Sequence, residues 1–340
     1  MSTNIKEKLK NFDLSDAKRN RETMWLEPTD KVAYLSSAMK TYGYRHIPIL
    51  KDDGSLACVV SIGDCVRIQT PRAQQLPVER LAKAGFQMMK LYDEVDKTGS
   101  MTIQEAFSDL FQRAVETVSE EESLEIAFNK LIARVDNRRY RTLPIVKANV
   151  SGISGMLSYT DLLTLIRDPN QENREFLSLK AFKIYTTEVK TFSSNQTLVE
   201  AIELLDGTPF RHIPLRQSDR REDTVITGIV DDITINTFHH KLLFRHLAKM
   251  PLSEVAQLSG EVGTLGEHNT ASLDDDLETV IDKFLGETKP TAILIGSFSQ
   301  KNFIMRGIVS YVDIFRKFLT YKLEDDDDGS EEELQQSAPQ

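Results

Sequence analysis

One short motif occurs twice in this chain, near the start as Arg45-His46-Ile47-Pro48 and beyond the middle as Arg211-His212-Ile213-Pro214. Each copy reads as an apolar strand entered by a basic pair, and each is followed by a turn, a second apolar stretch and a helix start. Weaker copies lie around Leu143-Pro144-Ile145-Val146 and Thr291-Ala292-Ile293-Leu294. A repeated supersecondary unit constrains the fold more than any other sequence feature. We therefore predict an α/β chain built from four copies of one unit.

The predicted units are too small to stand alone. A unit of roughly 55 to 60 residues buries little apolar surface, so we expect the units to pack in pairs, sheet against sheet. The first pair is expected at 24–168, with repeats at about 24–70 and 117–168. The second pair is expected at 188–321, with repeats at about 188–247 and 264–321.

The segments outside the repeats differ in composition. Residues 1–23 are polar with mixed charge, and 71–116 form an insertion with helical spacing of apolar residues. Residues 322–340 begin with an acidic run that cannot bury surface and is expected to be disordered. Residues 94–105 have the outline of a calcium loop ending at Glu105, although a polar connection between helices explains the same pattern.

Composition excludes several classes of protein. The chain has 340 residues, 40% of them apolar, and a net charge of −10, which argues against general binding to nucleic acid or to anionic membranes. It has neither an apolar leader nor an apolar run long enough to span a bilayer, so we expect a cytoplasmic protein. Cys58 and Cys65 are expected to be core residues in a reducing compartment.

Three units carry the same tetrad where the second strand meets its helix. The tetrads are Ser61-Ile62-Gly63-Asp64, Ser158-Tyr159-Thr160-Asp161 and Ser310-Tyr311-Val312-Asp313. Taken singly, each tetrad reads as a helix cap. At one topological position in three units it also suits a nucleotide, because a helix start favours phosphate and an Asp one turn later can accept hydrogen bonds from ribose hydroxyls.

A set of cations precedes the first long strand of each unit. Counting three residues back from the strand Pro gives Arg45, Arg141 and Arg211, and Lys289 is assigned the corresponding place in unit 4. His46 and His212 follow two of the Arg residues. These side chains could simply extend into water from strand edges. Their recurrence beside the tetrads favours contacts to phosphate, which Arg binds well through paired hydrogen bonds.

The pattern of strand, Pro, turn and Gly-hydrophobic-x-Ser-x-x-Asp resembles the CBS domain, and its four copies cover most of 24–321. The resemblance implies four βαββα-type CBS repeats paired into two Bateman modules, as in the γ subunit family of AMP-activated protein kinase. It also implies nucleotide-binding residues. The ribose contacts would be Asp64, Asp161 and Asp313, and the phosphate contacts would be Ser61, Ser158, Ser310, Arg45, His46, Arg141, Arg211, His212 and Lys289.

Unit 3 departs from the pattern. Asp231 occupies the position of the tetrad Ser, and Thr234 occupies that of the Asp. Two like charges about 4 Å apart at an effective dielectric near 20 repel by roughly 4 kcal/mol, about a thousandfold in affinity. We therefore expect this site to be empty or to take an uncharged nucleoside-like ligand. Unit 1 has Cys58 in place of the motif Gly, and unit 4 lacks the strand Pro.

The leading functional hypothesis is a regulatory, energy-sensing protein that binds AMP, ADP or ATP and passes its ligand state to a partner protein, such as a kinase, through module packing. We expect no enzymatic activity, cofactor or bound metal, because the chain lacks the sequence motifs of such sites. The net negative charge argues against nucleic acid and membrane partners. A homodimer is compatible with the family. The alternatives are an interaction scaffold that recruits a kinase, phosphatase or transporter without ligand, and a calcium-responsive protein that uses the insertion.

Overall fold

The computed structural model describes residues 24–42, 44–65, 68, 98–133, 141–147, 152–168, 171–207, 212–218, 224–231, 250–258, 263–300 and 302–321. Several sequence predictions lie outside these residues. They are the polar segment 1–23, the first part of the insertion, the acidic tail 322–340, the phosphate contact Arg211 and the unit 3 residue Thr234.

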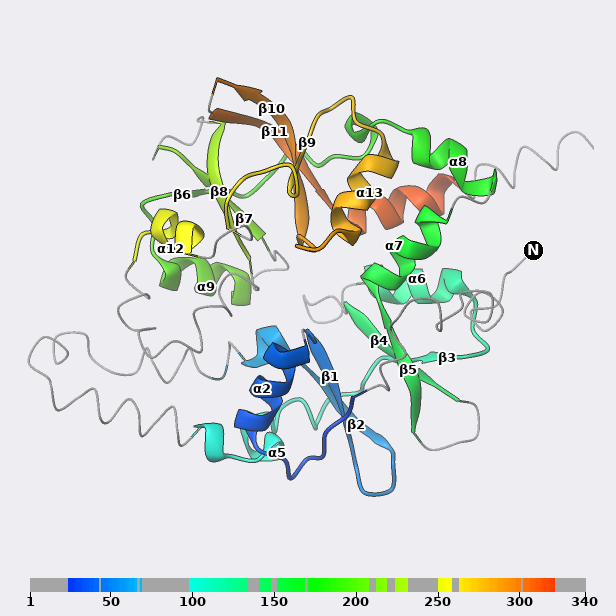
Figure 1. Cartoon of the computed structure of the whole chain (residues 1–340). Helices are drawn as coiled ribbons and strands as arrows, with labels where there is room; N and C mark the ends of the chain where they lie inside the picture. The colour runs from blue at the N-terminus through cyan, green and yellow to red at the C-terminus, as the bar shows by residue number, and fades with distance from the viewer. Residues whose placement is uncertain are drawn as a thin grey trace, which may run out of the picture.

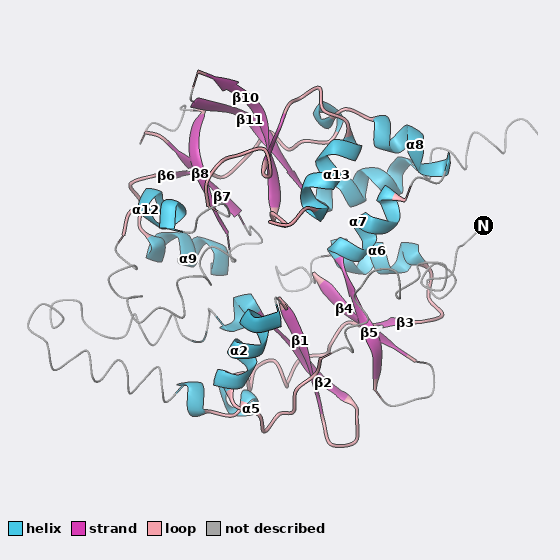
Figure 2. Ribbon diagram, viewed as in Figure 1, coloured by secondary structure: helices cyan, strands magenta, loops and turns pink. Residues whose placement is uncertain are grey.

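Units 2 and 4 have the order βαββα, and the described parts of units 1 and 3 follow the same order, as Figures 1 and 2 show. Unit 1 has a parallel bridge from Leu26 to Ile49, α2 (Val32–Tyr42), β1 (His46–Leu50), β2 (Leu56–Ser61) and a helical start at 62–65. Unit 2 has β3 (Val118–Ser119), α6 (Leu124–Ile132), β4 (Thr142–Val146), β5 (Ile153–Ser158) and α7 (Tyr159–Arg167). Unit 3 has β6 (Phe192–Ser193), α9 (Leu198–Gly207), β7 (His212–Arg216) and β8 (Val225–Asp231). Unit 4 has β9 (Thr270–Ala271), α13 (Leu277–Leu285), β10 (Ala292–Ser299), β11 (Asn302–Ser310) and a helix at 311–321.

The four hairpins share one irregularity, which confirms the repeat at the level of the backbone. In each hairpin the antiparallel register shifts once, at the same place in the first strand. The shifts fall between Ile49 and Leu50, Ile145 and Val146, Leu215 and Arg216, and Ile295 and Gly296. A bulge at a fixed place bends each hairpin in the same way. The units are therefore equivalent residue by residue across this hairpin.

The two modules differ in how their sheets join. In the second module, units 3 and 4 form a six-stranded sheet in the order β6-β7-β8-β11-β10-β9, because β8 pairs with β11 at Ile226 and Phe303. The same strands share an apolar cluster that includes Ile229, Leu294 and Ile308. In the first module the described strands form two smaller sheets, β1-β2 and β3-β4-β5. In the second module, the sheets of units 3 and 4 are therefore also joined at their edges by backbone pairing of β8 with β11.

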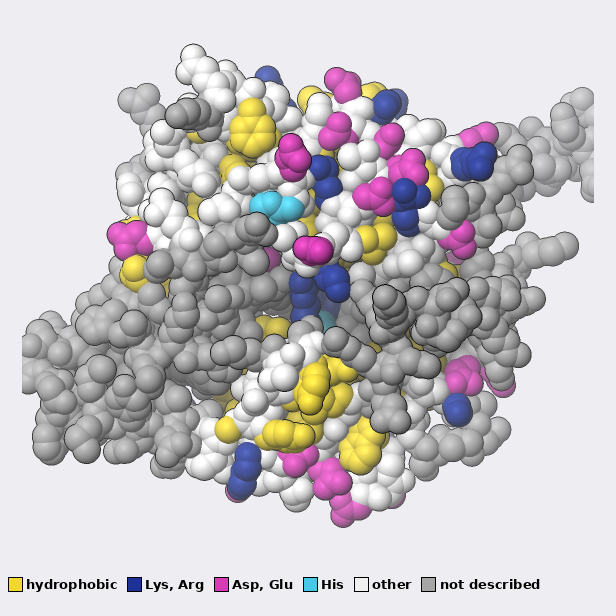
Figure 3. Space-filling view, in the orientation of Figure 1, with side chains coloured by type: hydrophobic (Ala, Val, Ile, Leu, Met, Phe, Trp, Pro, Cys, Tyr) yellow, Lys and Arg dark blue, Asp and Glu magenta, His cyan; other side chains and the backbone are white. Residues whose placement is uncertain are grey.

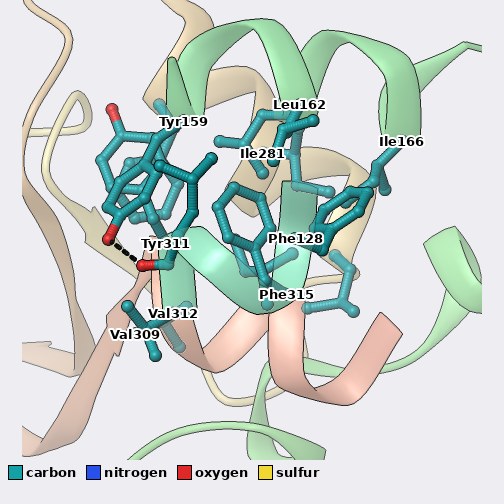
Figure 4. Packing of buried hydrophobic residues seen from close by; sticks show 14 of the residues in the cluster. Phe128, Tyr159, Leu162, Ile166, Ile281, Val309, Tyr311, Val312 and Phe315 are labelled. Carbon is teal, nitrogen blue, oxygen red and sulfur yellow. Dashed lines mark hydrogen bonds between the residues drawn. The ribbon is translucent and has the colours of Figure 1, made fainter. Parts of the chain in front are cut away.

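The largest core cluster lies between units 2 and 4 and joins the two modules. Aromatic rings from α6, α7 and the helix 311–321 meet there, as Figure 4 shows. The rings of Phe128 and Phe315 lie 5.1 Å apart edge to face, and those of Tyr159 and Tyr311 lie 5.3 Å apart. Burying each such ring contributes about 1.5–3 kcal/mol, and favourable ring geometry adds to this. The modules are therefore held together by helix packing rather than by a continuous sheet.

The helix interface also carries an ion-pair cluster at its surface. Arg167, at the end of α7, makes two hydrogen bonds to Asp282 of α13, of 2.6 and 3.1 Å. Its Nη1 lies 2.7 Å from a carboxylate oxygen of Glu278. Because these groups are partly exposed, they orient the two helices more than they stabilise them.

Among the described residues, further helical segments lie between the repeated elements in the sequence. They include α5 (Ile103–Ala106), α8 (Gln171–Ser178) and α12 (Leu252–Leu258), and a 3-10 turn covers Ala181–Lys183. The described part of the insertion belongs to unit 1, because Ile103, Phe107 and Leu110 join its core. Glu105, the last residue of the calcium-loop hypothesis, accepts a hydrogen bond from the Thr102 amide and completes a capping box at α5. Residues 94–97 of that loop lie outside the described residues.

Both cysteines lie in the core of unit 1, as expected. Burial raises the pKa of the Cys58 thiol to about 12 and also raises the pKa of Cys65 well above its ordinary value. Within the described residues, no group of three or more His, Cys, Asp or Glu side chains could hold a metal ion. None of the helices described is both long enough and apolar enough to cross a bilayer.

Candidate functional site

The three tetrads form closely similar caps where a second strand passes into its helix. Ser158 Oγ donates a hydrogen bond of 2.6 Å to Asp161 Oδ2, and the Ser158 amide donates to the same oxygen at 2.8 Å. Ser310 and Asp313 repeat both bonds at 2.6 and 2.8 Å. In unit 1, Ser61 donates the same two bonds to Asp64 Oδ2. The capping explanation of the tetrads is therefore correct, and it directs one oxygen of each Asp toward the cap.

The caps do not bury the tetrads. The Ser and Asp of all three are partly exposed, so they are accessible at the ends of their strands. Asp313 makes a further contact, because Thr186 Oγ1 donates a hydrogen bond of 3.2 Å to Asp313 Oδ1. Thr186 belongs to the segment that leads into unit 3, and its backbone pairs with Ile308 of β11. The segment that contains Thr186, which lies outside unit 4, thus contacts the tetrad residue Asp313.

The predicted cations of the first module lie close to the other units. Arg45 donates a hydrogen bond of 3.0 Å from Nη2 to the Lys289 carbonyl oxygen, which joins unit 1 to unit 4. His46 Nδ1 lies 2.9 Å from Thr142 Oγ1, and this contact joins units 1 and 2 at equivalent strand positions. Arg141 and His212 are partly buried at the corresponding entrances to their strands, and Lys289 is partly buried in the turn before β10.

Tyr311 is a point where the units converge. Its hydroxyl donates to the Pro290 carbonyl oxygen at 3.3 Å and interacts with the Thr160 side chain. Burial raises the pKa of Tyr311, while the positive charges of Arg45 and Arg141 act in the opposite direction. Two guanidinium groups from the first module therefore lie within electrostatic range of a buried hydroxyl of the second. Figure 3 shows Lys and Arg side chains gathered in the hollow between the two halves of the molecule.

The strand register corrects one predicted equivalence. In units 1 and 2 the residue after the Arg pairs with the tetrad Ser, as His46 with Ser61 and Thr142 with Ser158. In unit 4 the partner of Ser310 is Ala292, so Thr291 holds the position of Arg45, and Lys289 lies two residues earlier. Because unit 4 lacks the Pro that anchors the alignment, counting along the sequence misplaced the cation. The Lys289 backbone nevertheless lies beside Arg45, because its carbonyl oxygen accepts the Arg45 hydrogen bond.

At the position of the tetrad Ser, unit 3 has a buried acid that is hydrogen-bonded to unit 4. Asp231 is only 3% exposed, and it accepts a hydrogen bond of 2.9 Å from Thr291 Oγ1 of unit 4. Its negative charge acts on Tyr311 in the sense that raises the pKa of the hydroxyl. A buried carboxylate favours the approach of cations or neutral groups over that of phosphate. The position of Asp231 is consistent with the expectation for unit 3.

The motif Gly has different neighbours in different units. A Cβ on Gly307 would collide with Tyr185 and the Thr186 backbone, and one on Gly228 would lie 2.9 Å from the Gly263 oxygen. A Cβ on the equivalent Gly155 of unit 2 would make only an ordinary van der Waals contact, at 3.6 Å from Ile145 Cδ1. Cys58 fills this position in unit 1 and is 1% exposed. A side chain is therefore excluded at this strand position in units 3 and 4, where a connecting segment passes against the strand.

Sequence reasoning missed Tyr311, Thr291 and Thr186. The Tyr that follows the tetrad Ser is shared by units 2 and 4, in Ser158-Tyr159 and Ser310-Tyr311, and this repetition was a usable signal. A correct alignment of unit 4 would have placed Thr291 at the position equivalent to Arg45. Thr186 had no local signal, because its role depends on a segment that crosses from one unit to another.

Comparisons with known proteins find CBS domains in this chain. The CBS domain family model matches residues 16–70 and 107–168. The chain thus contains CBS domains, and its fold is that of CBS-type repeats paired as in Bateman modules. No curated protein sequence matches it.

Two solved structures show that this likeness extends along most of the chain. One is a protein of Methanocaldococcus jannaschii described as a candidate archaeal homologue of γ-AMPK, with a TM-score of 0.62 and 15% identity over 88% of this chain and 97% of that one. The other is an uncharacterised protein of Pyrococcus horikoshii, with a TM-score of 0.50 and 15% identity over 87% and 95% of the two chains. The fold of this chain is therefore similar to the folds of these two proteins.

Proposed function

We propose that this chain is a regulatory protein that binds adenine nucleotides between its CBS repeats and transmits the ligand state to a partner protein through module packing. The observation that best supports this is the hydrogen bond of Arg45 to the Lys289 carbonyl oxygen, which brings a guanidinium of unit 1 to the turn before β10 of unit 4, where the charge of Arg141 from unit 2 also acts on Tyr311. Convergent guanidinium groups suit the phosphates of AMP, ADP or ATP.

The proposed contacts divide by chemistry. Asp64, Asp161 and Asp313 would accept hydrogen bonds from ribose hydroxyls. The phosphates would be bound by the tetrad Ser residues and the cations, namely Ser61, Ser158, Ser310, Arg45, His46, Arg141, Arg211, His212 and Lys289. Each acid lies at a partly exposed helix start, which supports this assignment because the free N–H groups there favour anions. Unit 3 would not take a phosphate, because Asp231 occupies the position of the tetrad Ser.

The Arg45 hydrogen bond offers a physical route for transmission. A phosphate that engages Arg45 competes with the Lys289 carbonyl oxygen of the other module for the same guanidinium. A ligand shifts an equilibrium only by the difference in its affinity for the two states. Ligand binding in the first module would therefore weaken a specific contact to the second, and a partner protein that reads the module arrangement would respond.

Calorimetry with AMP, ADP and ATP tests the proposal. We expect binding to the wild-type chain and a loss of about tenfold or more for Asp161→Ala, because hydrogen bonds to a charged group contribute about 1.5–3 kcal/mol. The control is Glu105→Ala, since Glu105 completes the same kind of capping box at a helix with no proposed ligand contact. Equal affinities for the two variants would remove the ribose assignment, and the absence of any nucleotide binding would remove the function.

A second candidate function is a CBS-based interaction scaffold that recruits a kinase, phosphatase or transporter without using a ligand. The buried Asp231–Thr291 hydrogen bond favours it, because it replaces a proposed phosphate position with a contact between units 3 and 4. A thermal shift assay with millimolar nucleotide separates the two hypotheses. Stabilisation supports the sensor, because a ligand of the folded state raises the unfolding temperature, whereas an unchanged transition supports the scaffold.

A further inference from the structure

The β10–β11 hairpin of unit 4 extends further than the hairpins of the other units. The first hairpin strands of units 1, 2 and 3 end at the residue after the register shift, at Leu50, Val146 and Arg216. In unit 4 the equivalent residue is Gly296, and β10 continues to Ser299. The tip of this hairpin lies at the outer rim of the second module, on the side away from the first module (Figure 1). The repeat pattern therefore does not account for the last three residues of β10.

One edge of this strand end is open. β9 pairs with β10 only at Leu294 and Ile295. Ser299 pairs with Asn302 across a two-residue turn, and the two residues of such a closing pair bond to each other. Because hydrogen bonding alternates along an antiparallel pair, the N–H and C=O of Phe298 point away from β11. Among the described residues, no backbone group bonds to them. The edge thus offers one donor and one acceptor to an added strand.

The Phe298 side chain is exposed at the same place. It is 55% exposed, the highest fraction among the large apolar side chains that the structure describes. Its ring lies 5.1 Å from that of Phe303, edge to face, and Phe303 belongs to the apolar cluster shared by units 3 and 4. Ser297, Ser299 and Gln300 are also exposed. An apolar side chain beside an open strand edge suits strand addition, in which backbone bonds provide affinity and side chains provide specificity.

The equivalent positions in units 1 and 2 carry charged residues. Lys51 and Asp52 follow β1, and Lys147 follows β4, whereas Ser297 and Phe298 hold the equivalent places in unit 4. Charged side chains, Lys above all, are a common means by which natural proteins prevent pairing at a strand edge. The edge of β10 lacks this protection.

The charge and size of the hairpin tip indicate what kind of occupant it would accept. Residues 296–306 contain Lys301 and Arg306 and no acidic residue, in a chain whose net charge is −10. Two copies of the hairpin would bring like charges together. The exposed residues 297–300 are also far fewer than the about 20–30 residues a side of a stable interface between folded proteins. A flexible segment fits better, because strand addition joins an extended peptide to a sheet edge.

We propose that the edge of β10 at 297–299 is a docking site for an extended segment of a partner protein. The segment adds to the sheet beside β10, beyond the end of β9, and pairs with the backbone of Phe298. It carries apolar residues that pack on the Phe298 ring, at least one acidic residue, and no Lys or Arg. The proposal does not depend on nucleotide binding, so the two can fail separately.

Selection from a phage-displayed library of random eight-residue peptides tests the proposal. The full-length chain is the target, and its Phe298→Pro variant is used for counter-selection. Proline removes the outward N–H and leaves the bonds to β11 in place, because the Phe298 amide takes no part in them. We expect enriched peptides with alternating apolar residues and a net negative charge. Enrichment of basic peptides, or no enrichment over Phe298→Pro, would overturn the proposal.

Calorimetry with an enriched peptide separates the ring from the backbone. Phe298→Ala keeps the amide and should weaken binding by about tenfold, because the ring is lost. Phe298→Pro should weaken it by about a further tenfold, the effect of one backbone hydrogen bond. Phe182→Ala is the matched control and should leave the affinity unchanged, because Phe182 is 44% exposed and lies outside the hairpin. Equal affinities for Phe298→Ala and Phe298→Pro would contradict strand addition.

Hydrogen exchange provides a readout in the unmodified chain. Without peptide, the Phe298 amide should exchange faster than the amides of Ser297 and Ser299, which bond to β11. A saturating peptide should slow the exchange of Phe298 by about tenfold or more and leave the other two nearly unchanged. If the Phe298 amide is protected without peptide, the chain itself covers the edge. If its protection rises with the concentration of the chain alone, a second copy covers it. Either result would rule out the docking site.

Discussion

The Arg45 side chain of the first module donates its hydrogen bond to a backbone group held in an unfavourable conformation, the carbonyl of Lys289. Lys289 has a φ of 43°, in the left-handed region that costs a residue with a Cβ about 1–2 kcal/mol. It also precedes Pro290, whose own carbonyl accepts from Tyr311. Two side chains, one from each module, thus hold a strained turn where the modules meet.

This strain predicts that two substitutions of Lys289 differ in stability. Lys289→Gly should stabilise the turn by about 1 kcal/mol relative to Lys289→Ala, because both remove the side chain but only Gly tolerates the positive φ. If phosphate competes for Arg45, Lys289→Gly should also bind nucleotide several-fold more weakly than Lys289→Ala. Urea unfolding and calorimetry measure the two effects. Equal stability of the two variants would show that the turn is not strained.

The two kinds of contact between units 2 and 4 should differ in strength. Phe315→Ala removes a fully buried ring from the aromatic cluster, so it should lower the free energy of unfolding by about 3–5 kcal/mol. Arg167→Ala removes an exposed ion-pair cluster, so its cost should stay below about 1 kcal/mol and fall with added salt. Denaturant unfolding of both variants checks the order. A larger effect for Arg167→Ala would mean that electrostatics hold the modules together.

Thr291→Val should destabilise the second module by about 1–3 kcal/mol. The substitution preserves the shape of the side chain but removes a hydrogen bond to the buried Asp231 carboxylate. Thr320→Val is the control, because Thr320 is exposed and donates only within its own helix. That control should change the unfolding free energy by no more than about 0.5 kcal/mol. Similar changes in the unfolding free energy for both variants would show that the Thr291 hydrogen bond does not stabilise the buried Asp231.

Neither cysteine should react with a thiol reagent in the folded protein at pH 8. Burial excludes the reagent and raises the pKa of Cys58 to about 12, so little thiolate is present at that pH. In denaturant, both thiols should react at the rate of an exposed cysteine. Labelling followed by mass spectrometry gives the result, and rapid modification of Cys58 in the folded chain would place that strand at the surface.

The hairpins and caps could be predicted from the sequence because their signals are local. The strands Ile47–Leu50 and Ile213–Leu215 were recognised from apolar runs beside a Pro, and the Ser–Asp caps from a fixed three-residue spacing. Where the Pro was missing, in unit 4, the alignment failed by two residues and assigned Lys289 to the position of Thr291. The contact of Thr186 with Asp313 joins residues far apart in sequence and left no local pattern.

By itself, the sequence determined that four α/β units would form and which side chains would stand at their helix starts, because hydrophobic periodicity and capping act over a few neighbouring residues. Only the tertiary structure decided which units meet. It joined β8 to β11, packed Phe128 on Phe315, and brought Arg45 to Lys289 and Thr291 to Asp231. Such contacts depend on the complementary shape and charge of whole surfaces, which form only after the units have folded.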